Sequence, residues 1–172
     1  MDDQIIPLTG HDSPHVDGTA YVAPGARVIG NVTLSAHVGI WFNAVLRADS
    51  DAITIGAGSN IQDNVSCHGD PGFSLVVGRN VSVGHNAVLH GCTIEDDCLI
   101  GMGAIVMNGA VVGAGSLVAA GAIVLEGQQI PAGSLVAGVP AKVRRALTPD
   151  EQADIRRNAE SYRARIALYR AT

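Results

Sequence analysis

Aliphatic residues return at every sixth position through most of this chain. The spacing runs without a break over 94–136, and the same step carries the segments 16–46, 55–67 and 77–89. A period of six matches neither an α-helix nor the simple alternation of a strand. It is typical of a parallel β-helix, in which each coil buries its aliphatic side chains against the coils above and below. The pattern therefore predicts an all-β solenoid of about seven triangular coils over residues 15–140, with three hexapeptides in each coil.

The two ends of the chain depart from this step. Residues 1–14 read as a polar N-terminal lead-in. After the solenoid, Thr148, Pro149 and Glu151 form the signature of a helix start: a capping threonine, a proline at the first helical position and a glutamate that completes a capping box. Apolar residues then recur at helical spacing, at Ile155, Ala159, Tyr162, Ile166 and Tyr169. We therefore expect an α-helix over 148–170 that packs on the solenoid or on a neighbouring subunit.

The six-residue frame is interrupted three times. The interval between successive inward residues is nine over 46–55, ten over 67–77 and five over 89–94. Surplus residues must leave the prism as loops, and loops on a rigid solenoid are where function tends to lie. The first expected loop carries Arg47 and Asp49. We expect the functional site near these breaks and plain scaffold after them.

Three histidines, His68, His85 and His90, lie at or beside the breaks. Three steps make one coil, so His68 and His90 fall on the same face one coil apart and should stack at the inter-strand spacing of about 4.8 Å. His85 lies near a different corner, so one chain cannot easily bring all three imidazoles together, whereas two copies packed side by side can. Three neutral imidazoles with an open position form a typical catalytic zinc site, with Zn–N distances of about 2.0–2.1 Å. The pattern therefore predicts a metal site shared between two subunits.

Composition and charge narrow the class of protein. Hydrophobic residues make up 47% of the 172 residues and aromatic residues only 3%, as expected for a narrow solenoid that large rings would overfill. Eight of the 11 basic residues lie in 142–170. Because they alternate with acids on the expected helix, they are typical of a solvated face. We therefore expect neither a nucleic acid nor a membrane as a partner.

The cysteines and the N-terminus predict a cytoplasmic protein. Cys67, Cys92 and Cys98 show no C-x-x-C pairing, so we expect reduced and mostly buried thiols. The segment 1–4 lacks the basic and then apolar form of a signal peptide. The sequence also contains no apolar run as long as a membrane span.

Four motifs surround the histidines and carry a family resemblance. The segments 39–49, 60–68, 83–92 and 99–104 read GIWFNAVLRAD, NIQDNVSCH, VGHNAVLHGC and LIGMGA. Over about residues 14–170 the chain resembles the γ-class carbonic anhydrase family of hexapeptide-repeat proteins. The resemblance implies a left-handed β-helix and a homotrimer with metal sites at its subunit interfaces.

The resemblance also implies an activity, the reversible hydration of CO₂ to bicarbonate. The implied cofactor is Zn²⁺, bound by His68, His85 and His90, with Fe²⁺ or Co²⁺ as alternatives. Zinc lowers the pKa of a bound water from 15.7 to about 7, which gives hydroxide at neutral pH to attack CO₂.

Polar residues near the metal receive roles from the same resemblance. It implies that Arg47 and Asp49 lie at the subunit interface beside the metal, and the alternative is an exposed ion pair of little energetic value. Asn60 and Gln62 share a side by strand alternation, so both are expected beside the stacked histidines. A neutral amide such as Gln62 can hold the hydroxide or polarise CO₂ without competing for the metal. The alternative is a ladder of polar corner residues.

Two further residues complete the candidate site. Asp63 is expected to orient another side chain, because metal-bound imidazoles usually donate their second N–H to a carboxylate or a carbonyl. Tyr162 belongs to the apolar stripe of the helix, and the resemblance offers a second interpretation in which a C-terminal tyrosine approaches the metal pocket.

Two departures from the family pattern predict slow turnover. Ser50 stands where the archetypal member has a glutamate directly after its R-x-D motif. The loop after the first histidine is the short segment 69–74, with Asp70 as its only acid, where the archetype has an acidic loop that includes a proton-shuttling glutamate. We expect the transfer of a proton to bulk solvent to limit the rate.

Other functions use the same scaffold. A hexapeptide acyltransferase shares the repeats and the terminal AGVPAKVR of 137–144. Members of that class resemble one another in a single catalytic histidine and a long loop over the acyl-CoA site, so three histidines and short loops count against it. A metal-dependent thioesterase is a closer alternative, since it would use the same site. A non-enzymatic subunit of a larger assembly is the third, and metal content would separate it from the enzyme.

Overall fold

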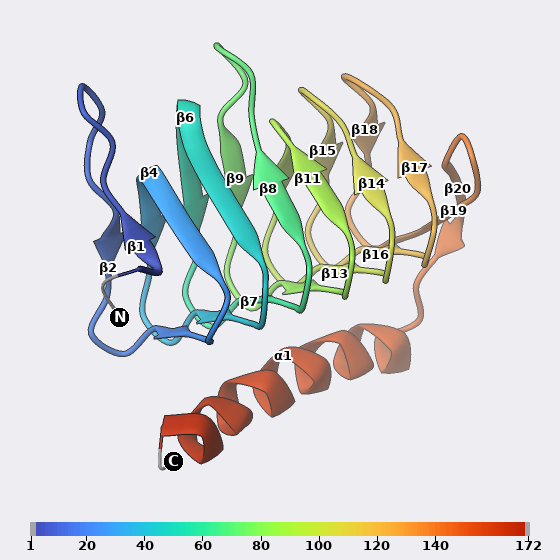
Figure 1. Cartoon of the computed structure of the whole chain (residues 1–172). Coiled ribbons are helices and arrows are strands. Elements are labelled where there is room, and N and C mark those ends of the chain that lie inside the picture. The colour runs from blue at the N-terminus through green and yellow to red at the C-terminus, as the bar shows by residue number, and fades with distance from the viewer. Residues whose placement is uncertain (1–2, 171–172) are drawn as a thin grey trace.

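The computed structural model describes residues 3–170, and within them the chain forms a left-handed parallel β-helix of about seven coils that ends in one α-helix (Figure 1). The first two residues of the predicted lead-in and the last two residues of the chain lie outside the described residues. The N-terminal coils lie at one end of the prism, and each later coil stacks on the one before it. The fold class expected from the six-residue spacing is confirmed.

Two faces of the prism are joined into one sheet by the long strands β4 and β6. The first face consists of β1 (Ile5–Ile6), β4 (Arg27–Leu34), β6 (Val45–Ile55), β8 (Ser66–His68), β11 (Val88–His90), β14 (Ile105–Val106) and β17 (Ile123–Val124). The second face shares β4 and β6 and adds β2 (His15–Val16), β9 (Leu75–Val77), β12 (Thr93–Ile94), β15 (Val111–Val112) and β18 (Gln129–Ile130). In both faces, each strand pairs in parallel with the equivalent strand of the neighbouring coil.

The third face is a separate sheet of eight strands. Its strands are β3 (Tyr21–Val22), β5 (Gly39–Ile40), β7 (Asn60–Ile61), β10 (Ser82–Val83), β13 (Leu99–Ile100), β16 (Leu117–Val118), β19 (Ser134–Ala137) and β20 (Lys142–Ala146). All the pairs along this face are parallel except the last, where β20 turns back and pairs antiparallel with β19. The solenoid therefore ends in a reversed strand.

The aliphatic residues of the six-residue step form the core. From Ile94 to Val136 every residue at this step is at most 4% exposed. Val16 and Val22, in the first coil, are only partly buried. The prediction that these positions point inward is confirmed. Each inward residue therefore fixes the direction of the side chains next to it in the sequence.

The N-terminal segment takes part in the solenoid, although the sequence predicted only a polar lead-in. Ile5 and Ile6 pair in parallel with Val28 and Ile29 of β4. The buried side chain of Gln4 donates hydrogen bonds to backbone carbonyls at the end of β3. This segment therefore supplies an incomplete first coil.

The prediction of a first loop within 46–55 is wrong. β6 is a continuous strand of 11 residues, and its pairing with β4 shifts between Gly30, opposite Ala48, and Val32, opposite Ile53. The surplus residues stay extended and bend around a corner because both β4 and β6 cross it. Asp49 is thereby held on a strand.

The second expected loop is present. Residues 69–74 leave the prism between β8 and β9. The third break is a tight bend at Gly91 between β11 and β12, and Gly91 has a φ of 53°, in the left-handed region that favours glycine.

The C-terminal helix begins as the sequence predicts. α1 spans Pro149–Arg170. Thr148 Oγ1 accepts from the Glu151 N–H at 3.2 Å, and the Glu151 carboxylate accepts from the Thr148 N–H at 2.8 Å. This reciprocal pair is the expected capping box.

Helix α1 lies along the third face and crosses β5, β7 and β10 (Figure 1). Ile155, Ala159 and Ile166 are its buried residues. Tyr162 stacks edge-on against Trp41, with ring centroids 5.5 Å apart. Within residues 3–170, no helix combines the length and the apolar character needed to cross a membrane.

Candidate metal centre

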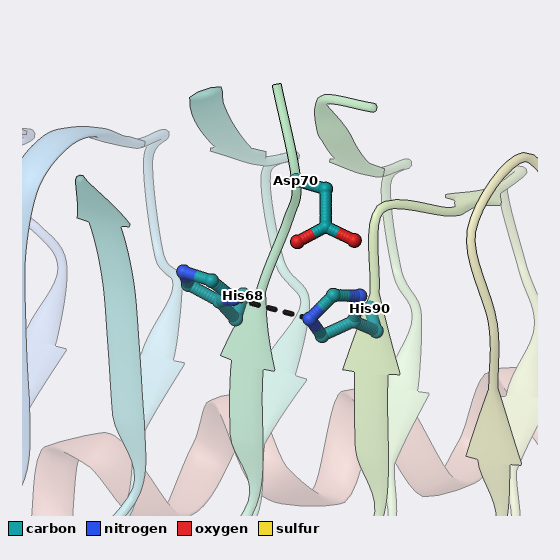
Figure 2. Close-up of side chains that lie close together, drawn as sticks. All are labelled: His68, Asp70 and His90. Carbon is teal, nitrogen blue, oxygen red and sulfur yellow. Dashed lines mark hydrogen bonds between the residues drawn. The ribbon is translucent and has the colours of Figure 1, made fainter. Parts of the chain in front are cut away.

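His68 and His90 end two neighbouring strands of the first face. β8 and β11 pair in parallel with His68 opposite His90. The ring centroids lie 5.1 Å apart, and His68 Nδ1 lies 3.1 Å from His90 Nε2. Figure 2 shows the two imidazoles side by side, with Asp70 above them. The stack expected from the repeat is confirmed.

Asp49 determines which nitrogen of His68 carries the proton. Its Oδ1 lies 2.9 Å from His68 Nε2, and its Oδ2 accepts a hydrogen bond from Arg47. The hydrogen bond from Arg47, followed by the one with His68, lowers the pKa of Asp49. An ionised carboxylate only accepts, so the N–H of His68 lies on Nε2. The lone pair on Nδ1 then faces His90.

Asn108 plays the same part for His90. Its Nδ2 donates to Asp70 Oδ2 at 2.8 Å, which leaves its Oδ1 to accept from His90 Nδ1, also at 2.8 Å. The lone pair of His90 therefore lies on Nε2. Two nitrogen lone pairs then face each other at 3.1 Å, and such a contact is favourable only with a positive charge between or beside them.

The separation of these nitrogens fits a shared metal ion. Two ligands of one tetrahedral zinc ion, each at about 2.0–2.1 Å, lie about 3.3 Å apart. The observed distance from His68 Nδ1 to His90 Nε2 is 3.1 Å. The donor set and its spacing therefore suit a divalent cation.

His85 follows β10 and lies on the third face. Its Nδ1 is 2.7 Å from Asp63 Oδ2, and the Tyr162 hydroxyl is 3.4 Å from its Nε2. Asp63 and His85 follow the inward residues Ile61 and Val83 by two positions, so stacking of the coils brings them together. Asp63 thus makes the orienting contact that the sequence predicts, and it leaves the lone pair of His85 on Nε2.

Tyr162 belongs to the helix stripe as expected and also approaches His85 from α1, while its approach to a metal pocket stays a prediction. Its ring belongs to the packed stripe of the helix, and its hydroxyl reaches the histidine. Burial raises the pKa of Tyr162, so the hydroxyl stays protonated and can donate a hydrogen bond beside His85.

Asn60 and Gln62 lie on the third face with His85, and not beside the stacked histidines as expected. Gln62 is 6% exposed and donates through Nε2 to Asn60 Oδ1 at 3.1 Å, while Asn60 donates to Ser82 Oγ at 2.9 Å. The correction follows from β7 belonging to the third face and β8 to the first.

A cavity of about 400 Å³ lies between α1 and the third face, next to His85. The residue after the inward position is Gln62 in one coil and Gly84, Gly101 and Ala119 in the next three coils, and all four line the cavity. Its polar groups are those of Gln62, His85, Asn158 and Tyr162, and its other walls are mainly apolar. The cavity is therefore mostly apolar, with His85 in its lining.

One chain holds the three histidines in two groups. Among the described residues, His68, Asp70 and His90 offer ligand atoms within 4.8 Å of one another, and His85 is not part of this cluster. The separation agrees with the argument that only a second copy can supply His85 to the pair. The sharing of the site between subunits stays a prediction.

Two models of hexapeptide families match the chain. One is described as bacterial transferase hexapeptide (six repeats) and matches residues 91–126. The other, hexapeptide repeat of succinyl-transferase, matches residues 74–106. Both cover the repeating scaffold and do not distinguish between the chemistries built on it.

Curated relatives decide the family. The chain is 55% identical over 141 residues to a Methanocaldococcus jannaschii protein named "Probable carbonic anhydrase", with 82% of this chain and 89% of the relative covered. It is 44% identical over 156 residues to the Arabidopsis thaliana protein "Gamma carbonic anhydrase 2, mitochondrial", which covers 87% of this chain. The chain belongs to the γ-class carbonic anhydrase-like family. It spans 56% of the length of the Arabidopsis relative.

A solved structure supports the fold of this γ-class chain over nearly all of its length. A hexapeptide transferase family protein from Anaplasma phagocytophilum superimposes with a TM-score of 0.94 and 41% sequence identity, covering 98% of this chain and 99% of the other. The match supports the fold and does not bear on the reaction of this chain.

Sequence reasoning did not assign roles to Asp70 and Asn108 in this γ-class site. Asn108 follows the inward residue Val106 by two positions, which places it one coil beyond the stacked pair. It contacts Asp70 across 38 positions of sequence. The only available signal was that Asp70 is the sole acid in a loop directly after a candidate ligand.

Proposed function

We propose that this protein is a metal-dependent carbonic anhydrase that interconverts CO₂ and bicarbonate, as a homotrimer with a metal site at each subunit interface. One observation carries the proposal: each of the three histidines has one ring nitrogen held by an oxygen acceptor. These acceptors are Asp49 for His68, Asn108 for His90 and Asp63 for His85. This arrangement is typical of metal-binding histidines.

His68 and His90 of one chain and His85 of its neighbour would hold the metal, which we propose is Zn²⁺, with Fe²⁺ or Co²⁺ as alternatives. When bound, such an ion lowers the pKa of a coordinated water to about 7. The chain supplies orientation. Asp49 and Asp63 keep two of the imidazoles in the required tautomer, and Arg47 keeps Asp49 ionised.

The cavity beside His85 suits CO₂, which is small, uncharged and apolar. Its walls include Leu99, Ile100 and Leu117. Gln62 lies at its polar end and gives one N–H to Asn60. The second N–H of the amide can hold an oxygen of the substrate, and the Tyr162 hydroxyl lies within reach of the same end. Bicarbonate then leaves through the open side.

The direct test combines metal analysis with kinetics on protein purified without chelator. We expect close to one divalent ion per chain and CO₂ hydration above the uncatalysed rate, followed by stopped-flow with a pH indicator. We expect the rate to depend on buffer concentration, since proton transfer limits it. Metal-loaded protein with no hydration activity would remove the enzymatic proposal, and a chain that binds no metal would remove the site.

The sharing of the site is tested by mixing His68→Ala and His85→Ala chains. Each variant alone should be inactive. In a randomly mixed ring, about a quarter of the interfaces combine an intact His68 and His90 with an intact partner His85. Co-refolding should therefore restore about a quarter of the parent activity. No recovery, in oligomers shown to be mixed, would contradict the shared site.

A further inference from the structure

Asp70 lies directly above the stacked histidines in Figure 2, with its carboxylate turned toward them. Its oxygen and the nitrogens of His68 and His90 lie within 4.8 Å of one another. Adjacent ligands of one ion at about 2.0–2.1 Å lie about 3 Å apart. The Asp70 side chain would therefore have to move by up to about 2 Å to join the two imidazoles on one ion.

The loop that carries Asp70 is fixed by Asp51. This carboxylate accepts from the Gly72 N–H at 2.9 Å and from Ser74 Oγ at 2.6 Å. The Ser74 contact, followed by those with the backbone, lowers the pKa of Asp51, so it remains an acceptor. Within the loop, the Phe73 N–H donates to the Asp70 carbonyl at 2.9 Å. The position of Asp70 is thus determined by several independent contacts.

The loop is also fixed from the side by Phe73, which packs over Gly91. A Cβ at Gly91 would lie 2.6 Å from Phe73 Cβ and 2.3 Å from Asn108 Oδ1. Both distances are too short for any side chain, so only glycine lets the loop and Asn108 approach this closely. Gly91 directly follows His90, so the same bend seats the loop and the histidine.

Asn108 links Asp70 to His90. Its amide donates to Asp70 Oδ2 and accepts from His90 Nδ1, each at 2.8 Å. The second oxygen of Asp70 takes no part in that hydrogen bond, and Figure 2 shows the carboxylate turned toward the two imidazoles. An anionic oxygen and two nitrogen lone pairs thus face the same region, and a cation there would relieve their mutual repulsion.

We infer that Asp70 is an oxygen ligand of the metal, so that one chain alone carries a two-histidine, one-carboxylate set for a divalent cation. The inference rests on the proposed metal site and adds a ligand to it. A set of this kind with open positions is typical of Fe(II), whereas three imidazoles are typical of catalytic zinc. Asp70 thus makes the site suitable for Fe²⁺ or Co²⁺, and it allows a chain to take up metal before it meets the neighbour that supplies His85.

The test removes the neighbour's contribution and then Asp70. Co²⁺ is titrated into His85→Ala, into His85→Ala with Asp70→Asn, and into His85→Ala with Asp154→Asn, which removes an equal charge from the exposed side of α1. Asparagine at position 70 can still accept from Asn108, so the loop keeps its contact. Circular dichroism checks that each variant is folded, and calorimetry and visible absorption report binding.

We expect His85→Ala to bind one Co²⁺ per chain, more weakly than the parent. Adding Asp70→Asn should weaken binding by more than the roughly 10- to 100-fold that loss of an outer partner costs, and Asp154→Asn should leave it unchanged. In the parent, Asp70→Asn alone should change the visible absorption of bound Co²⁺.

Equal affinity with and without Asp70→Asn, together with an unchanged spectrum, would overturn the inference. So would a His85→Ala chain that binds no Co²⁺ while the parent does, and that result would leave the proposed function standing. A parent that binds no metal would instead refute the proposed function itself.

Discussion

The coils after Ile94 and the coils that carry the histidines share one scaffold but differ at a single column of positions. In β8 and β11 the residue after the inward position is His68 or His90, and each strand is three residues long. In β14 and β17 the strands have two residues, and the next positions hold Met107 and Leu125. The repeat therefore determines where this column points, and the residue type decides whether it offers a metal ligand.

The interrupted coils also differ from the regular coils in the segments that lie beside His68 and His90. Loop 69–74 and the bend at Gly91 bring Asp70 and Asn108 to the histidines, whereas the regular coils continue from turn to turn without an insertion. A core that excludes water and a site that binds a cation can thus be changed separately. Substitutions in the two regions test that separation, from the largest expected effect to the smallest.

His90→Ala should abolish stoichiometric metal binding and leave the fold intact. The substitution removes a ligand from the histidine column, while the aliphatic core beneath it is unchanged. Metal content by mass spectrometry and far-UV circular dichroism check the two halves of this prediction. A gross loss of β-structure would mean that the metal supports the fold and that the two regions are not separable.

Ile100→Ala, in the third face within the regular coils, should have the opposite effect. Ile100 is fully buried, and truncations of this kind cost about 2–5 kcal/mol in the free energy of unfolding. Denaturant unfolding measures the loss. Metal affinity of the folded protein should match the parent. A matching loss of metal affinity would show that strain passes from the core to the site.

Asn108→Ala should weaken metal binding by about 10- to 100-fold, the usual effect of removing a partner that orients a metal-bound histidine. The side chain is the common contact of His90 and Asp70. Calorimetric titration with Zn²⁺ checks the affinity. Gln129→Ala, at an exposed position on the second face, is the matched control and should have no effect.

Tyr162→Phe should produce the smallest change. The ring and its contact with Trp41 remain, and only the hydroxyl that lies 3.4 Å from His85 is lost. One neutral hydrogen bond contributes about 0.5–1.5 kcal/mol, so kcat/KM for CO₂ hydration should fall by about two- to tenfold with stability nearly unchanged. A drop of several orders of magnitude would give the hydroxyl a direct part in the chemistry.

The sequence predicts those features that follow from local periodicity. The inward residues, the stack of His68 and His90 and the capping box at Thr148 each depend on a fixed spacing, and the structure confirms them. The three cysteines are free and buried as expected, and burial raises the pKa of Cys92 to about 12.

Other features depend on contacts that no spacing records. The strand β6 bends around a corner where a loop was expected, because β4 beside it crosses the same corner and pairs with it on both sides. Gln62 lies by His85 because its strand belongs to the third face. The approach of Asp70 to Asn108 requires Phe73 to pack on a glycine, which is a property of the folded loop.

The reversed strand β20 limits how such a solenoid can associate with itself. A parallel coil exposes a row of backbone donors and acceptors on which another chain can add strands, as in fibre growth. At the C-terminal end of the third face, β20 occupies that row, and its exposed residues include Lys142 and Arg144. Like charges along an edge repel a second copy. Stacking of whole molecules along the prism axis is thereby opposed on this face, and side-by-side association remains open.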